Sequence, residues 1–189
     1  MLFTHDTEVA LEGAAALVNT MPGSVPGDSS TDNLTTVKQL EALYAAQRWT
    51  GRFDHDTREL EAVRAMRPRL RELWERDEAG VVELVNGLLA ESRAVPQLVE
   101  HDGVGWHIHA TPADAPLAQR MAVEAAIAAI DVVRAGELSR LRICEADDCD
   151  AVVIDLTRNR SRRFCEGGCA ARAHTAAYRA RARRAATDP

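Results

Sequence analysis

Four cysteines near the C-terminal end of the chain constrain its fold more than any other feature of the sequence. They are Cys144, Cys149, Cys165 and Cys169, with the spacing C-x4-C-x15-C-x3-C, and the 189 residues contain no other cysteine. Two closely spaced pairs separated by a loop are typical of a tetrahedral zinc site, because each pair supplies two thiolates from one tight turn. The sequence therefore predicts a structural Zn²⁺ ion, since four protein ligands leave no open position for a catalytic water.

Other interpretations of the cysteines are two disulfides or four inert thiols. The start of the chain, MLFTHDTEVA, has no basic segment followed by an apolar stretch, so we expect no secretion signal and a cytoplasmic protein. A reducing cytoplasm favours metal ligation over disulfides. His174 is an alternative ligand only if one of the cysteines is not one.

No apolar run is long enough for a membrane span, which needs about 18 residues or more.

The sequence between and after the cysteine pairs predicts a small treble-clef-like module. Residues 152–154 predict a strand, residues 157–161 a polar turn, and residues 163–164 the return to the second pair, which together form a hairpin. A helix is predicted over residues 170–184. The module is expected to occupy residues 138–189.

The positive charge of the chain is concentrated in the same module. The whole chain has a formal charge of −6, but residues 157–184 contain nine arginines and one acid, which gives +8 for this segment and leaves −14 for the rest. A basic end on an acidic body is typical of a nucleic-acid-binding segment. The alternatives are a solvated helix face or a tail that docks on the acidic body of its own chain. The candidate DNA contacts are Arg158, Arg160, Arg162, Arg163, Arg172, Arg179, Arg181, Arg183 and Arg184.

The arginines of the predicted helix and of the predicted hairpin have different expected roles. A helix over residues 170–184 would be about 22 Å long, enough to lie along a groove of DNA. Arg172, Arg179 and Arg183 are seven and four residues apart, so they share one face of this helix. Arg172 lies near the helix start and is the candidate for a base or phosphate contact. The hairpin arginines are expected to contact phosphates, which give affinity without sequence information.

Residues 1–137 predict a mostly helical domain with one β-hairpin, so the fold class is mainly α. Thr36 and Gln39 fit a capping box at the start of the second helix, and Thr111-Pro112 resembles a capped start for the last one. The Pro- and Gly-rich segment 21–33 predicts a mobile loop. Helices are predicted over residues 7–19, 36–51, 53–77, 81–92 and 111–135.

Residues 96–111 predict the hairpin, with Asp102-Gly103 as its turn. Alternation along the second strand places Trp106 and Ile108 on one face and His107 and His109 on the other. Large aromatic side chains usually supply burial, so Trp49, Trp74 and Trp106 are expected in the core. The alternative is that these tryptophans line the pocket of a small-ligand sensor.

Residues that could catalyse a reaction occur in the helical domain, but their pattern is weak. They are His5, Asp54, Asp56, His107 and His109. Two histidines without a third ligand or a paired acid are a weak signal, so we expect the hairpin to present them to solvent. The sequence contains no phosphate loop, no nucleophile elbow and no zinc-deaminase motif. We therefore expect that the protein is not an enzyme.

The C-terminal module resembles a known zinc finger. The segments CEADDC, TRNRSRRFC and CAARAHTAAYRARARR are similar to the CGNR-type zinc finger found at the C-terminus of bacterial proteins. The family run Asn-x-x-Arg-Arg-aromatic-Cys appears here as residues 159–165. The name-giving Cys-Gly-Asn-Arg appears as residues 169–172, where the cysteine and the arginine match.

The rest of the chain resembles the companion ABATE domain, whose hallmark is an apolar N-terminal helix that ends near Val18-Asn19-Thr20. Together these resemblances cover nearly the whole chain and imply a transcriptional regulator with a helical domain of unknown task at residues 1–137. The basic finger makes DNA the expected partner. The alternatives are a zinc-stabilised module that binds protein or RNA, and a small-ligand sensor in the helical domain. A homodimer would raise DNA affinity through effective concentration, although the sequence does not require one.

Overall fold

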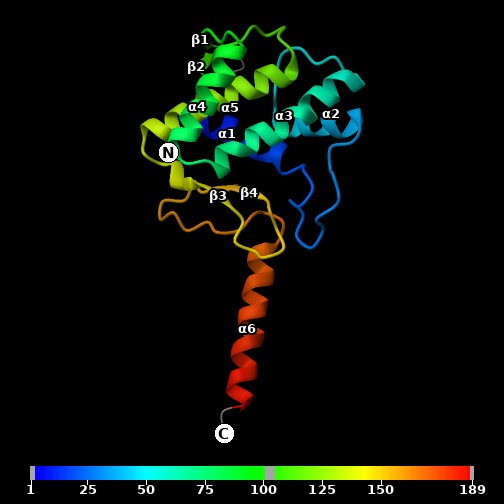
Figure 1. Cartoon of the computed structure of the whole chain (residues 1–189), viewed down its shortest axis with the longest axis vertical. Coiled ribbons are helices and arrows are strands. Elements are labelled where there is room, and N and C mark those ends of the chain that lie inside the picture. The colour runs from blue at the N-terminus through cyan, green and yellow to red at the C-terminus, as the bar shows by residue number, and fades with distance from the viewer. Residues whose placement is uncertain (1–2, 101–104, 188–189) are drawn as a thin grey trace.

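The computed structural model describes residues 3–100 and 105–187, with side chains as far as residue 182, and the fold is mainly α-helical. The helical part contains α1 (His5–Val18), α2 (Val37–Ala46), α3 (Thr57–Glu75), α4 (Glu78–Glu91), an antiparallel hairpin of β1 (Gln97–Glu100) and β2 (Trp106–His109), and α5 (Leu117–Arg134). The C-terminal part contains a 3₁₀ turn η1 (Leu138–Arg140), the strands β3 (Leu141–Ile143) and β4 (Val152–Ile154), and α6 (Cys169–Thr187). The β1–β2 hairpin lies at one end of the molecule, and α6 projects from the other (Figure 1).

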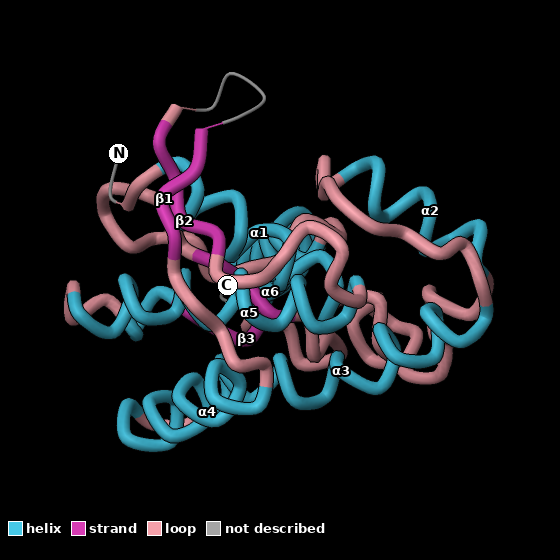
Figure 2. Tube along the Cα trace, turned by 90° about the horizontal axis from the view of Figure 1, so that it is seen from above, coloured by secondary structure: helices cyan, strands magenta, loops and turns pink. Residues whose placement is uncertain are grey.

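The alanine-rich helix α5 organises the helical part, because it packs against α1, α3 and α4. Its buried face is built largely from small side chains, which lets the neighbouring helices approach closely. Viewed along the long axis of the molecule, the β1–β2 hairpin and α2 lie on opposite sides of this helix group (Figure 2). The buried alanines of α5 are Ala118, Ala122, Ala125, Ala126, Ala128 and Ala129.

The starts of α2, α3 and α4 follow the capping chemistry of the sequence, whereas α1 and α5 begin without a side-chain cap. The capping box of Thr36 and Gln39 is present as predicted. The predicted start of α5 at Thr111-Pro112 is wrong, because α5 begins at Leu117. Residues 112–115 form a turn instead, and the carbonyl of Ala113 accepts a hydrogen bond of 2.9 Å from the backbone of Arg52. This contact ties the segment to the loop before α3 and keeps it out of the helix.

The β1–β2 hairpin alternates as predicted, but its buried face is the opposite of the expected one. His107 is 9% exposed and lies on the inner face, whereas Trp106 is 70% exposed. The prediction of solvent-facing histidines is therefore wrong, and Trp106 does not belong to the core. His107 is held by its own strand, with Nδ1 2.8 Å from the Gly105 carbonyl oxygen and Nε2 3.0 Å from His109 Nε2. The predicted turn at Asp102-Gly103 lies outside the described residues.

The segment predicted to be a mobile loop is tied down by ion pairs and hydrogen bonds. Both carboxylate oxygens of Asp32 accept hydrogen bonds from the buried guanidinium of Arg67 on α3, at 2.8 and 2.7 Å. This contact with Arg67 holds the pKa of Asp32 well below its usual range. The guanidinium of Arg67 also donates to Thr20 Oγ1 at 3.0 Å, so one buried arginine fixes both ends of the loop.

The C-terminal hairpin of β3 and β4 packs into the same apolar core as the helices. Leu141, Val152 and Ile154 contribute to that core. At the outer edge of β4, the side-chain amide of Asn19 replaces a neighbouring strand. Asn19 Nδ2 donates to the Val152 carbonyl at 2.9 Å, and the Val152 N–H donates to Asn19 Oδ1 at 2.7 Å. The end of α1 is thereby joined to the C-terminal module.

We predict that Asn19→Ala lowers the free energy of unfolding by about 2–4 kcal/mol, because both polar groups of the buried Val152 backbone lose their partners. Urea denaturation followed by circular dichroism measures the change. Asn159→Ala is the matched control, since Asn159 is exposed in a turn, and it should change stability by less than about 0.5 kcal/mol. An Asn19→Ala protein with the wild-type midpoint would show that this contact does not join the two parts.

Candidate metal centre and arginine surface

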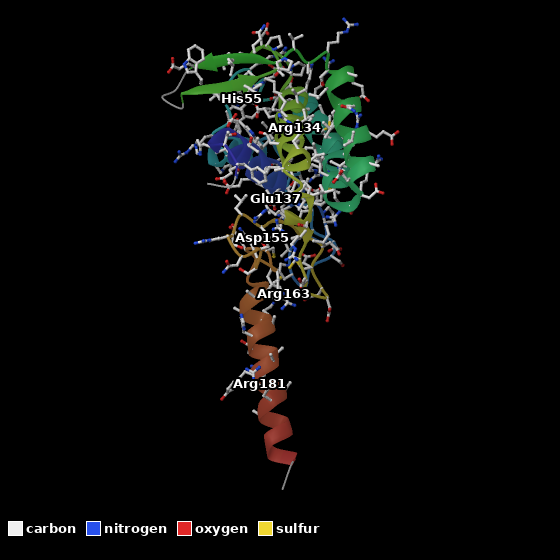
Figure 3. All side chains as sticks on the ribbon, turned by 90° about the vertical axis from the view of Figure 1, so that its left-hand side faces the viewer. His55, Arg134, Glu137, Asp155, Arg163 and Arg181 are labelled. Atoms are coloured by element: carbon white, nitrogen blue, oxygen red, sulfur yellow. The ribbon has the colours of Figure 1, made fainter. Side chains whose placement is uncertain are left out.

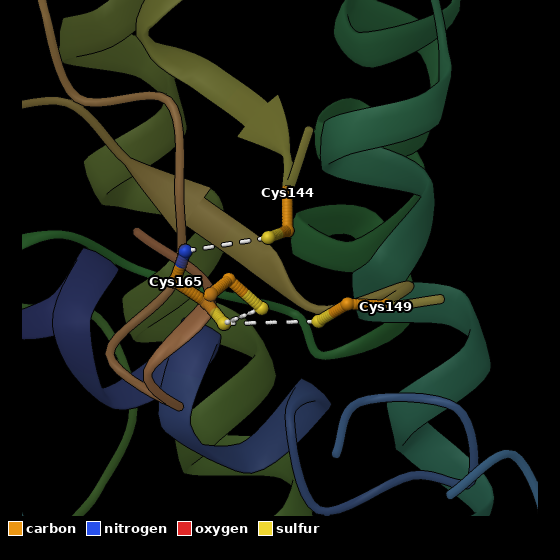
Figure 4. A group of neighbouring side chains, drawn as sticks. Cys144, Cys149 and Cys165 are labelled. Atoms are coloured by element: carbon orange, nitrogen blue, oxygen red, sulfur yellow. Dashed lines mark hydrogen bonds between the residues drawn. The ribbon is translucent and has the colours of Figure 1, made fainter. Parts of the chain in front are cut away.

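The four cysteines converge on one point. Their Sγ atoms all lie within 4.8 Å of one another, with 3.7 Å between Cys149 and Cys165 and 3.6 Å between Cys165 and Cys169 (Figure 4). A tetrahedral zinc ion with Zn–S bonds of about 2.3 Å separates its sulfur ligands by about 3.8 Å. A disulfide would need about 2.05 Å. The cysteines are therefore positioned to coordinate one metal ion, and the site fits structural zinc.

The local fold explains how four separate positions meet. Cys144 directly follows β3, and its N–H donates to the Ala151 carbonyl at 2.8 Å, which closes the turn that carries Cys149. Cys165 comes from the loop after β4, and its N–H donates to Cys144 Sγ at 3.4 Å. Cys169 is the first residue of α6. The partner of β4 is β3, so the predicted hairpin between residues 152–154 and 163–164 is wrong.

The surroundings of the sulfurs favour a bound cation. Cys144, Cys149 and Cys169 are buried, and Cys165 is partly buried. Burial raises the pKa values of the Cys149 and Cys165 thiols, because thiolates are poorly solvated there. A divalent ion would offset that penalty by binding the thiolates directly. His174, the alternative ligand, is an exposed residue of α6 and is not part of the ligand group found among the described residues.

A segment of the helical part covers the cysteine cluster. The backbone of Gly27 donates to the Asp148 carbonyl at 3.2 Å, and the backbone of Asp150 donates to the Gly23 carbonyl at 2.8 Å. A Cβ atom at Gly167 would lie 3.1 Å from Pro26 Cδ, so the glycine allows this close approach. This cover could not be predicted from the sequence, because the contacting residues are more than a hundred positions apart.

Arg172 serves the zinc site in a way that the sequence did not indicate. Its guanidinium donates two hydrogen bonds to the Asp148 carboxylate, at 2.6 and 2.7 Å, and one to Cys169 Sγ at 3.4 Å. Burial opposes ionisation of Cys169, but the hydrogen bond from Arg172 is the main contact that lowers the pKa of this thiol. Arg172 therefore clamps the first cysteine pair to the start of α6.

A buried carboxylate shapes the loop that carries the other arginines. Asp155 has no exposed surface, and it accepts hydrogen bonds from the backbone of Thr157 at 3.0 Å and of Arg162 at 2.9 Å. The buried Arg140 donates to the Asp155 carbonyl at 2.7 Å from the start of the module. These bonds turn the chain after β4 so that residues 157–163 lie on the surface beside the cysteine cluster.

The basic residues of the finger fall into two groups. The first group is paired with carboxylates of the same chain: Arg160 with Glu137 at 2.8 Å, Arg162 with Glu166 at 2.9 Å, Arg163 with Glu145 at 2.6 Å, and Arg172 with Asp148 at 2.6 Å. The guanidinium of Arg163 also lies over the Phe164 ring. The arginine of each pair is solvent-accessible, and exposed ion pairs contribute only about 0–1 kcal/mol each. A phosphate can therefore compete for Arg160, Arg162 and Arg163, whereas Arg172 also donates to Cys169 Sγ.

The second group has no carboxylate partner in the described part of the chain. Arg158, Arg179 and Arg181 are exposed, and none of the described carboxylates lies within 4.0 Å of them. Figure 3 places Arg163 at the base of α6 and Arg181 on the length of α6 that extends beyond the rest of the chain. Arg183 and Arg184 lie in the last turns of α6, and their side chains are outside the described residues.

The candidate catalytic residues have structural contacts. Asp54 pairs with Arg52 at 2.6 Å, and Asp56 caps α3 by accepting a 2.8 Å hydrogen bond from the backbone of Glu59. His5 begins α1.

Trp74 is buried in the core, and Trp49 packs against the core while partly exposed. None of the described helices combines the length and the hydropathy needed to cross a membrane.

These features define a zinc-finger protein with a helical N-terminal domain. The family model of ABATE, described as "Putative stress-induced transcription regulator", matches residues 12–136. The model of the CGNR zinc finger matches residues 140–182. The chain therefore belongs to the ABATE family and carries a CGNR zinc finger. A comparison with curated proteins finds no match.

We predict that one zinc ion binds per chain and that its removal is sensed by Trp74. The indole N–H of this buried residue donates to the Val153 carbonyl at 3.1 Å, so loosening of β4 would let water reach the ring. Chelation should shift the emission of Trp74 to longer wavelength, measured in a Trp49→Phe/Trp106→Phe background, and added zinc should reverse the shift. Zinc release without any change in emission would show that the helical core is insensitive to the metal.

We also predict that Arg172→Ala weakens zinc affinity by about 10–100-fold, because groups that hold a metal ligand tune its affinity by this amount. Competition with a chromophoric chelator measures the affinity. Arg179→Ala removes the same charge from the same helix without touching the cluster, and it should leave zinc affinity unchanged. Equal losses in both variants would mean that only the net charge of the finger matters.

Proposed function

We propose that this chain is a transcription regulator that binds DNA through the arginine-rich surface of its zinc finger. The observation that carries the proposal is the projection of α6 from the metal cluster, with Arg179 and Arg181 exposed and without carboxylate partners in the described part of the chain. The family description supports the regulatory role, and the charge of the finger supports a polyanionic partner.

The shape of α6 suits a groove of DNA. The helix has 19 residues, which corresponds to a length of about 28 Å. Residues 174–182 are exposed, so this length of the helix has little packing of its own. A helix that lacks tertiary packing is only marginally stable in water, and phosphate contacts on both sides of the major groove would stabilise it. The anchor at Cys169 and Arg172 fixes the direction in which the helix enters.

The two groups of arginines are expected to contribute unequally to the affinity for DNA. Arg179 and Arg181 on α6, together with Arg158 on the loop, can meet phosphates without first leaving a carboxylate. Arg160, Arg162 and Arg163 must exchange an acidic partner for a phosphate, so each adds less net affinity. Arg172 is occupied by Asp148 and Cys169, which makes it a positioning residue of the finger. Neutralised phosphates release counterions, so binding should weaken steeply with salt.

We predict that the zinc-loaded full-length protein binds random duplex DNA and that Arg179→Gln/Arg181→Gln weakens this binding. Fluorescence anisotropy over a salt series measures the affinity. The double variant should bind about tenfold more weakly at moderate salt, and the slope of log K against log salt should fall by about two, because two phosphate contacts are lost.

The matched control is Arg58→Gln/Arg134→Gln, which removes the same charge from exposed positions of the helical part. It should bind DNA as the wild type does. Absence of binding at low salt, or equal losses in the two double variants, would refute the proposal. Tighter retention on single-stranded or duplex RNA than on DNA would move the assignment to an RNA-binding module.

A further inference from the structure

A cleft of about 720 Å³ lies beside the β1–β2 hairpin, which is at the end of the molecule opposite α6 (Figure 1). Its walls come from the loop between α2 and α3, the connection from α4 into β1, the inner face of the β1–β2 hairpin, and the first turns of α5. It is separate from the metal cluster and from the arginine surface of the finger. The side chains that matter to its chemistry are Arg93, Val95, Val99, His109, Pro112 and Arg120.

Arg120 places a buried positive charge in this cleft. It is 6% exposed, and its guanidinium donates to the backbone carbonyls of Thr50, Arg52 and Ala115, the last at 3.1 Å. Within the described residues, no carboxylate lies within ion-pairing distance of it. Carbonyl oxygens satisfy hydrogen bonds but do not neutralise the charge, and a buried charge is costly without a counter-ion.

The backbone at Gly51 leaves space for the guanidinium of Arg120. Gly51 has a φ of 86°, a conformation that side chains other than glycine rarely adopt. A Cβ atom at Gly51 would overlap Arg120 Nη1 and would lie 2.7 Å from the Ala113 carbonyl oxygen. The glycine therefore leaves space for the guanidinium of Arg120 at the wall of the cleft.

The rest of the lining combines positive charge with apolar surface. Arg93 and His109 are the other titratable residues, and none of the described residues that line the cleft is acidic. The nearest acid on α5 is Glu124, one turn beyond Arg120, and it lies beyond ion-pairing distance. Burial raises the pKa of Glu124, while the charges of Arg120 and His107 act to lower it, so this carboxyl interacts with Arg120 through space without forming an ion pair with it. A chain with a net charge of −6 thus presents a cationic cleft here.

We infer that this cleft binds a small organic monocarboxylate, with its carboxylate between Arg120 and Arg93 and its apolar body against Val95, Val99 and Pro112. The exposed Arg93 offers a planar guanidinium that matches a carboxylate in geometry as well as in charge, and Arg120 adds a buried positive charge. The apolar walls favour a ligand with one charged end over a dicarboxylate or an inorganic anion. This inference is independent of DNA binding, since the cleft and α6 lie at opposite ends of the molecule.

The test uses the zinc-loaded full-length protein at constant ionic strength, with hexanoate and phenylacetate as probes. Both should raise the melting temperature in a concentration-dependent way, and titration calorimetry should give a saturable isotherm. Hexanol, hexylamine and inorganic phosphate should not stabilise the protein, because each lacks either the negative charge or the apolar body. Arg93→Gln should weaken hexanoate binding by about tenfold, since a charge-assisted hydrogen bond is lost at the mouth of the cleft.

Arg134→Gln is the matched control, because it removes the same charge from an exposed position at the far end of α5. Its hexanoate affinity should equal that of the wild type. Arg120→Lys, which keeps the charge but loses hydrogen bonds to the carbonyls that hold the guanidinium in place, should also weaken binding. The inference is overturned if neither carboxylate binds, if hexanol or phosphate binds as well as hexanoate, or if Arg93→Gln and Arg134→Gln behave alike.

Discussion

The C-terminal module depends on four sulfur atoms that lie close together, three of them on buried cysteines, and that a cation would stabilise. The apolar cluster around them is small, with Ala151 and Val153 as its buried members besides the cysteines, and with Phe164 packed at its side. So little apolar burial around the cysteines stabilises this side of the module only weakly, whereas structural zinc contributes roughly 10–16 kcal/mol in comparable sites. The metal therefore decides whether the loop of residues 157–163 and the start of α6 have a fixed position.

Zinc alone would leave the finger free to rotate on the helical part, and a second set of contacts prevents this. Asn19 pairs with the backbone of Val152, the indole of Trp74 donates to Val153, and Arg71 donates to the Asp150 carbonyl at 2.8 Å. These donors come from α1 and α3, on one side of the β3–β4 hairpin. The finger is thus held by metal on one face and by the helical core on the other, which fixes the direction of α6.

The zinc site could be predicted from the sequence because its chemistry is local: few residue types bind zinc, and the pair spacing limits how they can meet. The roles of the arginines could not, since their partners come from other segments. From the sequence alone, Arg172 is predicted to contact DNA. Its partner Asp148 lies 24 residues away along the chain, and only the fold brings the two side chains together. The β1–β2 hairpin shows the same limit. The alternation of side chains along a strand predicts that Trp106 and His107 lie on opposite faces, but the packing of the hairpin decides which face is buried.

Helix α5 is the element that connects the two ends of the molecule. Arg120 in its first turns lines the cleft, and its C-terminal end leads to Glu137, which binds both Arg140 and Arg160 of the finger. Because α5 packs against α1, α3 and α4, it forms a rigid connection between the cleft and the start of the finger. Of the two arginines that Glu137 binds, Arg140 is buried and Arg160 is about half exposed. Solvent weakens the pair with Arg160, so the loop of residues 157–163 is tied to this end of α5 less firmly than Arg140 is.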